Sequence, residues 1–221
     1  MRHPKLGREA RMQPLPLYPS LESTRLAVEE CTACPRSETR QMAVFGIGNR
    51  GANLMLVGEA PSSTDDDTGK PFTGPAGRLL DRVLADIGIS RDEIWITNLT
   101  RCFAGRERNN RIENRPATVR EIRACSSWMD IELQYVNPKV IVAVGAPAAR
   151  SLIAADFRLQ DQRGEFFERP DGRLAIATYQ PAYVMRLTSI VDKAASDTAR
   201  DQLTSDLRMA AEAAGLGGDH S

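Results

Sequence analysis

The sequence of 221 residues predicts an α/β fold in which an open parallel sheet carries helices on both faces. Four short, continuous apolar runs have the length and composition of strands that are buried on both sides. Several segments around these runs have the periodicity of amphipathic helices. A chain that alternates strands and helices through right-handed crossovers builds a parallel sheet, and ligands bind where its strands end. We therefore expect the functional site in the loops that follow the strands.

The predicted elements follow one another along the chain. A short helix starts near Leu21, after a lead-in that contains basic residues and prolines. The predicted strands are residues 54–57, 94–97, 140–144 and 174–178. The predicted helices are residues 76–87, 119–135 and 146–153, and an alanine-rich helical segment over 189–214 ends at Gly215.

Length and charge set the overall organisation. The chain is long enough for one sizeable core, so we expect a single domain over residues 21–214 between tails at 1–20 and 215–221. Twenty-nine basic residues balance 29 acidic ones, so any contact with a polyanion must come from local clustering. The start of the chain carries neither a long apolar run nor a secretory signal, and we expect a cytoplasmic protein without membrane contact.

Four cysteines form a candidate metal site. Cys31 and Cys34 are a C-x-x-C pair, Cys102 follows the second predicted strand, and Cys125 lies in the next helical segment. Thiols stay reduced in the cytosol, where they serve as metal ligands or as buried apolar residues. Four thiolates suffice for zinc or for an iron-sulfur cluster. The spacing alone separates neither these two metals nor a set of unrelated buried cysteines.

The loops after the strands carry the candidate binding residues. The first strand runs into residues 58–62, then an acidic stretch at 63–67 and a turn that contains Phe72. The second strand ends at Asn98, whose amide offers the donor and the acceptor that reading a pyrimidine edge requires. Taken singly, these residues also suit a solvated loop, core packing and an ordinary turn.

Residues 101–123 carry seven arginines against three glutamates, a patch that favours contact with a nucleic-acid backbone but also suits a solvated face.

Together these motifs resemble the family 4 uracil-DNA glycosylases, which are iron-sulfur members of the uracil-DNA glycosylase superfamily. The resemblance extends from about Cys31 to Arg186. It rests on motifs that occur in the order of the family: the C-x-x-C pair, residues 58–62, residues 68–74, Thr97-Asn98, Asn114-Arg115 and residues 180–186.

The resemblance implies a three-layer α/β/α sandwich with a central four-stranded parallel sheet. It also implies a 4Fe-4S cluster on the four cysteines, with zinc as the alternative occupant. The implied function is base excision repair, in which the protein flips uracil or a related deaminated base out of DNA and hydrolyses its N-glycosidic bond. Free uracil is the product. We expect a monofunctional enzyme, because Lys70 is the only lysine in the pocket motifs and no other lysine there could act as the nucleophile of a lyase step. We also expect a monomer.

The resemblance further implies roles for individual residues. Phe72 stacks on the flipped base, Asn98 binds its edge, and Gly58, Ala60 and Ser62 complete the base-binding pocket. Glu59 and the backbone that follows it place a water near the sugar. For the contact with DNA, Val184 or Met185 fills the vacated stack and Arg186 grips a phosphate, while Arg115 belongs to the basic segment.

Two positions depart from the family pattern: Ser62 stands in place of glycine, and Gln180 stands in place of histidine. The family's histidine donates a hydrogen bond to the uracil oxygen that gains charge, and losing one such donor costs about 2.7 to 4 kcal/mol. Glutamine keeps an N–H donor on a longer stem, so excision is either ordinary or weakened and altered. The only histidines, His3 and His220, lie in the tails and cannot replace it. Ser62 either narrows the pocket or changes the favoured base.

Other functions remain open from the sequence. The fold can bind uracil-containing or modified DNA without turnover. A related branch, UdgX, traps DNA covalently through a histidine in an Arg-Ile-His segment, and the similar stretch here ends in Glu113, within a lengthened basic loop at residues 105–113. A carboxylate at that position can in principle attack the sugar. A zinc-stabilised nucleotide-binding domain is a further alternative.

Overall fold

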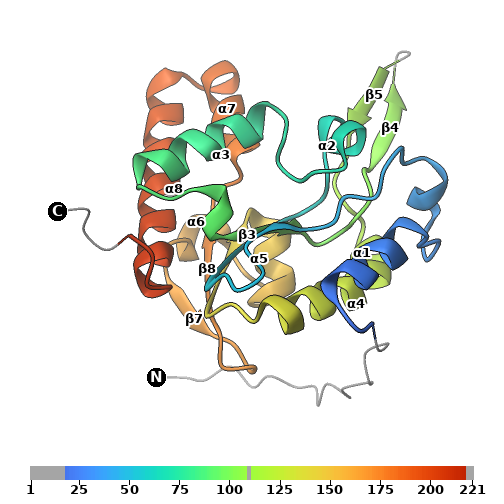
Figure 1. Ribbon diagram of the computed structural model, residues 1–221. Helices are drawn as coiled ribbons and strands as arrows, with labels where there is room; N and C mark the ends of the chain where they lie inside the picture. The colour runs from blue at the N-terminus through green and yellow to red at the C-terminus, as the bar shows by residue number, and fades with distance from the viewer. Residues whose placement is uncertain (1–17, 109–110, 218–221) are drawn as a thin grey trace.

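The computed structural model describes residues 18–108 and 111–217, and only the backbone of the strands within 106–113. Its main feature is a six-stranded sheet with helices on both faces (Figure 1). In spatial order the strands are β1 (Ile47–Gly48), β3 (Trp95–Asn98), β2 (Leu54–Gly58), β6 (Val140–Val144), β8 (Leu174–Thr178) and β7 (Phe166–Glu168). None of the described helices is long and apolar enough to cross a membrane.

The four central strands β3, β2, β6 and β8 are parallel to one another. They lie at or within one residue of the predicted strands, and their apolar residues are buried on both sides, except Leu174 at the start of β8. The predicted α/β class is therefore confirmed. The predicted number of four strands was wrong, because the sheet has six. The antiparallel edge strands β1 and β7 contain two and three residues, too short to produce a continuous apolar run in the sequence.

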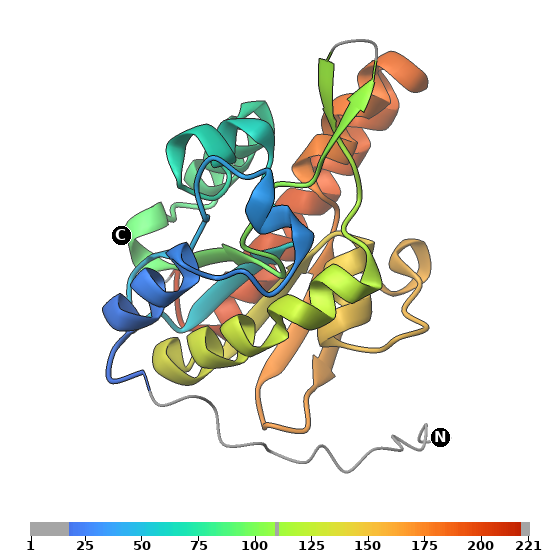
Figure 2. The ribbon, with the colours of Figure 1, turned by 90° about the vertical axis from the view of Figure 1, so that its right-hand side faces the viewer.

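Helices pack on both faces because successive strand residues point to opposite sides. Leu54 and Leu56 face a core shared with α3 (Pro75–Asp86), α7 (Pro181–Ile190) and α8 (Lys193–Ala213). Met55 and Val57 face a second core shared with α1 (Leu21–Glu29), α4 (Val119–Val136) and α5 (Ala146–Leu152). Figures 1 and 2 show these two helical layers on either side of the sheet.

Two segments differ locally from the prediction. The acidic stretch after Ser62 is a short helix, α2 (Ser63–Thr68), because Ser62 and Asp65 form a capping box at its start. The helix predicted over 189–214 is the second part of a hairpin of two helices, α7 and α8. The break occurs at Val191 and Asp192, where the Asp192 carboxylate accepts a hydrogen bond from the backbone N–H of Ala195 (2.7 Å) and caps α8.

The basic segment after β3 forms a hairpin, not the predicted loop. Its strands are β4 (Gly105–Arg108) and β5 (Arg111–Asn114), paired in antiparallel register. The hairpin projects from the body of the protein on the same side as α2 and the start of α7 (Figures 1 and 2). Its outer part therefore stands clear of the main sheet. The remaining short elements are α6 (Leu159–Gln162) and the 3-10 helices η1 (Pro35–Glu38) and η2 (Arg91–Glu93).

Candidate active site

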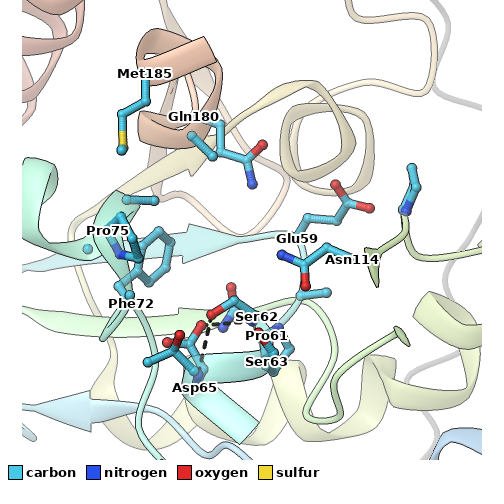
Figure 3. Close-up of a pocket in the computed structure, with 18 of the residues that line it drawn as sticks. Glu59, Pro61, Ser62, Ser63, Asp65, Phe72, Pro75, Asn114, Gln180 and Met185 are labelled. Carbon is cyan, nitrogen blue, oxygen red and sulfur yellow. Dashed lines mark hydrogen bonds between the residues drawn. The ribbon is translucent and has the colours of Figure 1, made fainter. Parts of the chain in front are cut away.

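A cavity of about 560 Å³ lies at the carboxyl ends of β2, β3 and β8, where the strand order predicts a ligand site (Figure 3). The loop after β2, the end of β3, the end of β5 and the start of α7 all contribute to its wall. Nine of the predicted site residues line it: Glu59, Ala60, Ser62, Phe72, Asn98, Arg115, Gln180, Met185 and Arg186. These residues are spread along the sequence from the end of β2 to α7. They come together only because the chain folds.

Asn98 and Phe72 meet above Gly58. Asn98 is the last residue of β3, pairs with Gly58 of β2, and is 2% exposed. Its Nδ2 has no hydrogen-bond partner among the described residues. A Cβ on Gly58 would lie 2.4 Å from Asn98 Oδ1 and 2.7 Å from Phe72 Cζ, so only glycine leaves room for both side chains. An amide edge and an aromatic face on a glycine floor suit a planar, hydrogen-bonding ring.

Glu59 is oriented by a backbone segment far away in the sequence. Its Oε1 accepts a hydrogen bond from the N–H of Ala117 at 2.6 Å. The side chain is half-buried and lies on the same side of the cavity as Asn114 (Figure 3). Among residues 18–105 and 114–217, whose side chains are described, no partner is recorded for Oε2.

Gln180 is the N-cap residue of α7, but its side chain does not cap the helix. The amide extends into the cavity toward Glu59 and Asn114 (Figure 3). Gly145 lies against it, since a Cβ there would be 3.4 Å from Gln180 Cβ, and Gly145 has a φ of 94°. The amide of Gln180 offers a neutral N–H donor to whatever occupies the cavity.

Ser62 uses its hydroxyl to cap a helix. Its Oγ accepts a hydrogen bond from the N–H of Asp65 (3.3 Å), while the Asp65 carboxylate accepts one from the N–H of Ser62 at 2.9 Å (Figure 3). The sequence left open what this serine does in place of a glycine. Its oxygen is held at the start of α2, so Ser62 contributes structure at the rim of the cavity.

The first turns of α7 separate three predicted DNA-binding residues. Met185 and Arg186 are exposed and line the cavity. Val184 is 2% exposed and packs in the core with α3 and α8. Of the two residues predicted to fill the vacated base stack, Met185 is therefore the one that faces the cavity.

Arg115 lines the cavity but is already bound to a carboxylate. Its Nη1 and Nη2 donate to Glu121 at 2.9 and 2.6 Å. The same carboxylate accepts from Arg36 (2.9 Å) and from the N–H and hydroxyl of Thr118. These hydrogen bonds, first among them those from Arg115, hold the pKa of Glu121 well below its usual range. Arg115 therefore anchors the segment after β5 as well as facing the cavity.

The four cysteines come from three parts of the chain into one region. Burial raises the pKa of the Cys102 thiol, and it raises the pKa of the Cys125 thiol to about 11. The charge of neighbouring cysteines adds to both shifts. Arg40 donates to Cys102 Sγ at 3.1 Å, and the N–H of Arg101 donates to Cys125 Sγ at 3.3 Å. Hydrogen bonds to sulfur and a cationic surrounding suit a cluster that carries four thiolates.

The spacing of the thiols bears on the kind of metal site. A tetrahedral zinc ion holds its sulfur ligands about 3.8 Å apart, given a Zn–S bond of about 2.3 Å. Within the described part of the chain, no three His, Cys, Asp or Glu side chains converge closely enough to hold a single metal ion. An iron-sulfur cluster is larger than one ion and accepts a wider arrangement of thiolates. The four free cysteines supply the number of thiolates that such a cluster needs.

Some predicted residues lie outside the described part of the chain, and some site residues were missed. His3, His220 and the side chain of Glu113 lie outside the described part of the chain. The backbone N–H of Ala117, which orients Glu59, carries no signal in the sequence because any residue has an N–H. Asp65 could have been found from its capping-box spacing to Ser62.

Comparisons with known proteins identify a family. The sequence matches the family described as "Uracil DNA glycosylase superfamily" over residues 45–208. It is 36% identical to the type-4 uracil-DNA glycosylase of Thermotoga maritima over 160 residues, which cover 72% of this chain and 80% of that protein. Identity to the type-4 uracil-DNA glycosylase of Pyrobaculum aerophilum is 34% over 176 residues (75% and 85%), and to the type-5 uracil-DNA glycosylase of Thermus thermophilus 31% over 156 residues (62% and 67%). The matched range contains every cavity-lining residue named above.

Proposed function

The chain belongs to the uracil-DNA glycosylase superfamily, and we propose that it is a monofunctional DNA glycosylase that excises uracil, or a related deaminated base, from DNA. The observation that carries this proposal is the amide of Asn98, which is buried and lies beside the Phe72 ring, and whose Nδ2 has no partner in the described part of the chain. A buried donor without a partner is costly unless a ligand satisfies it. The edge of a flipped pyrimidine supplies the missing acceptor.

Excision then needs stabilisation of the charge that develops on the departing base. In this proposal Asn98 Nδ2 donates to one base oxygen, and the Gln180 amide donates to the oxygen that gains charge. Donors that are already oriented toward such an oxygen lower the barrier because they need no rearrangement during the reaction. Gln180 thus takes the place of the histidine in the family pattern and performs its role with a neutral amide.

The attacking water is assigned to Glu59. Its Oε1 is held by the N–H of Ala117, which leaves Oε2 to accept a hydrogen bond from a water at the sugar. A carboxylate in this position orients the water and accepts its proton as the bond to C1′ forms. The base leaves with the electrons of the glycosidic bond, and the sugar retains the hydroxyl group.

We also propose that Cys31, Cys34, Cys102 and Cys125 hold a 4Fe-4S cluster. When bound, the cluster supplies a covalent cross-link between the end of α1, the end of β3 and α4. Arg101 joins this region to the base pocket, because its N–H contacts Cys125 and its guanidinium donates to the backbone carbonyl of Asn98. The cluster is therefore structural, and it supports the strand end that carries Asn98.

A single-turnover assay tests the proposed function. Excess protein is mixed with DNA that contains one uracil, and free base and alkali-labile sites are measured. The expected result is release of uracil with formation of an abasic site. DNA that is shifted on a native gel without base release indicates a binding protein, and a heat-stable band on a denaturing gel indicates a covalent trap. The same assay with hypoxanthine, xanthine and oxidised pyrimidines in single- and double-stranded DNA determines the base preference.

Gln180→His is expected to add a pH-dependent step to excision. An imidazolium donates a stronger hydrogen bond to an anionic base than an amide does, so the variant rate should rise about tenfold as the pH falls through about 6.5. The wild type should lack this step, since an amide does not titrate. Gln180→Asn is the matched control, because asparagine keeps the amide on a side chain that is shorter by one methylene. This variant should slow excision at every pH. A Gln180→His variant without a pH-dependent gain would show that this side chain does not face the charged oxygen.

The basic hairpin is expected to contribute salt-dependent affinity. Replacing both Arg106 and Arg108 by alanine should weaken binding to uracil-containing DNA and to undamaged DNA alike, and should lower the slope of log Kd against log salt by about two. Fluorescence anisotropy over a salt series measures this slope. Replacing Arg158 and Arg208, which are exposed elsewhere on the protein, removes the same charge and should leave the slope unchanged. Equal effects of both pairs would contradict a hairpin contact.

A further inference from the structure

The turn that presents Phe72 has a backbone conformation that its own sequence does not favour. Phe72 has a φ of 56°, in the left-handed region, although it is not glycine. For a bulky residue this conformation is strained and persists only where neighbouring groups hold it. The ring is only half-buried and borders the cavity (Figure 3), so burial in the core does not explain the conformation.

We propose that Arg91 is a positioning residue that clamps this turn and thereby sets the face on which the flipped base stacks, an inference that rests on the proposed function. Arg91 begins η2, the 3-10 helix before β3. Its Nη2 donates to the carbonyl of Phe72 at 2.6 Å, and its Nη1 donates to the carbonyl of Pro71 at 3.2 Å. The two bonds hold consecutive peptide units on either side of the Phe72 Cα.

The guanidinium is itself held in place. Arg91 Nε forms an ion pair with Asp81 of α3, and Nη2 also approaches the carbonyl of Gly77 at 3.5 Å. The side chain of Arg91 is 25% exposed, so its pairs are partly shielded from solvent. A planar guanidinium can make these parallel contacts with two carbonyls and a carboxylate, whereas the ammonium of lysine is a point charge.

A second clamp acts from the opposite side of the turn. Asp65 Oδ1 accepts hydrogen bonds from the N–H and the hydroxyl of Thr73, each at 2.7 Å. Gly77 packs against the turn so closely that a Cβ there would lie 1.7 Å from the carbonyl oxygen of Phe72. Arg91 and Asp65 thus hold the residues before and after the Phe72 side chain, and the ring is fixed next to Asn98 and Gly58.

A double-mutant cycle tests the clamp. Arg91→Ala should raise the Kd for uracil-containing DNA and the inhibition constant of free uracil about tenfold, with a smaller change in the single-turnover rate at saturation. In a Phe72→Ala background the same substitution should change either constant less than twofold, since the ring it positions is absent. Arg91→Lys should recover part of the loss. Arg82→Ala, which removes an exposed arginine from α3, is the matched control and should have no effect. A tenfold effect of Arg91→Ala that persists without Phe72 would overturn the proposal.

A spectroscopic readout keeps the clamp testable if the protein proves not to excise uracil. Labelling with fluorophenylalanine gives one resonance for each of the six phenylalanines, and the Phe72 resonance is assigned by its loss in Phe72→Leu. Arg91→Ala should shift or broaden this resonance and leave the resonance of the buried Phe157 unchanged. An unchanged Phe72 resonance would overturn the clamp, whatever the activity. Absence of base release by the wild type, with a shifted resonance, would instead refute the proposed function alone.

Discussion

Replacing Asn98 by alanine is expected to slow single-turnover excision between about a hundredfold and a thousandfold, with no loss of stability. The activity falls because the substitution removes an oriented donor to the base. The free energy of unfolding should stay within about 1 kcal/mol of wild type or rise, because the deleted Nδ2 has no partner among the described residues and its burial is a cost. Base release under enzyme excess and urea unfolding measure the two quantities.

Thr97→Val provides the matched control for this prediction. Thr97 precedes Asn98 in β3, and its Oγ1 is likewise buried without a described partner, but the residue does not line the cavity. Valine has the same shape, so the variant should be at least as stable as wild type and fully active. If Asn98→Ala kept its rate, or if Thr97→Val lost it to the same degree, Asn98 would not be the residue that reads the base.

Replacing Cys125 by serine is expected to remove the visible absorption of the purified protein at about 400 nm and to lower its melting temperature by about 10 °C or more. A cluster bound only by the folded chain stabilises that chain, so its loss lowers stability directly. Excision should fall as well. The N–H of Arg101 contacts Cys125 Sγ while its guanidinium holds the carbonyl of Asn98, so the base pocket lies next to the damaged site.

Ser126→Ala is the control on the neighbouring position of α4, because its hydroxyl bonds only locally to the carbonyl of Arg123 and the residue is exposed. This variant should keep the colour, the melting temperature and the activity. Iron and sulfide analysis of both proteins identifies the metal. A colourless wild type that contains zinc would contradict the cluster, and a Cys125→Ser protein as stable as wild type would contradict its structural role.

The two predictions separate two roles that overlap in space. In the proposed function Asn98 acts on the substrate, so its replacement is expected to affect activity without stability. The cysteines are proposed to act on the scaffold, so their replacement is expected to affect both. Arg101 connects them within one short segment after β3. A comparison of the two variants therefore distinguishes a pocket that has lost a donor from a pocket whose support has been loosened.

Much of the fold could be predicted because burial of the central strands is a local property of the sequence. A strand covered on both faces is a continuous apolar run, and residues 140–144 and 174–178 agree with β6 and β8 without any shift. The edge strands and the basic hairpin were missed for the opposite reason. β1 and β7 have no apolar run of their own and exist because β3 and β8 offer them hydrogen bonds. The start of α2 had a local signal, the capping box of Ser62 and Asp65, but its acidic residues were interpreted as a solvated loop.

The order of the motifs, the alternation of strands and helices, and the chemical groups available to the site all follow from the amino-acid sequence. An amide at Asn98, a carboxylate at Glu59 and a glutamine at Gln180 are legible without a structure. The contacts that those groups make become visible in the folded protein alone. The N–H that orients Glu59 lies 58 residues away at Ala117, and Val184 turns into the core while Met185 faces the cavity. The physical reason is that residue type follows from the chain alone, whereas the direction and the partner of a side chain depend on contacts between distant segments.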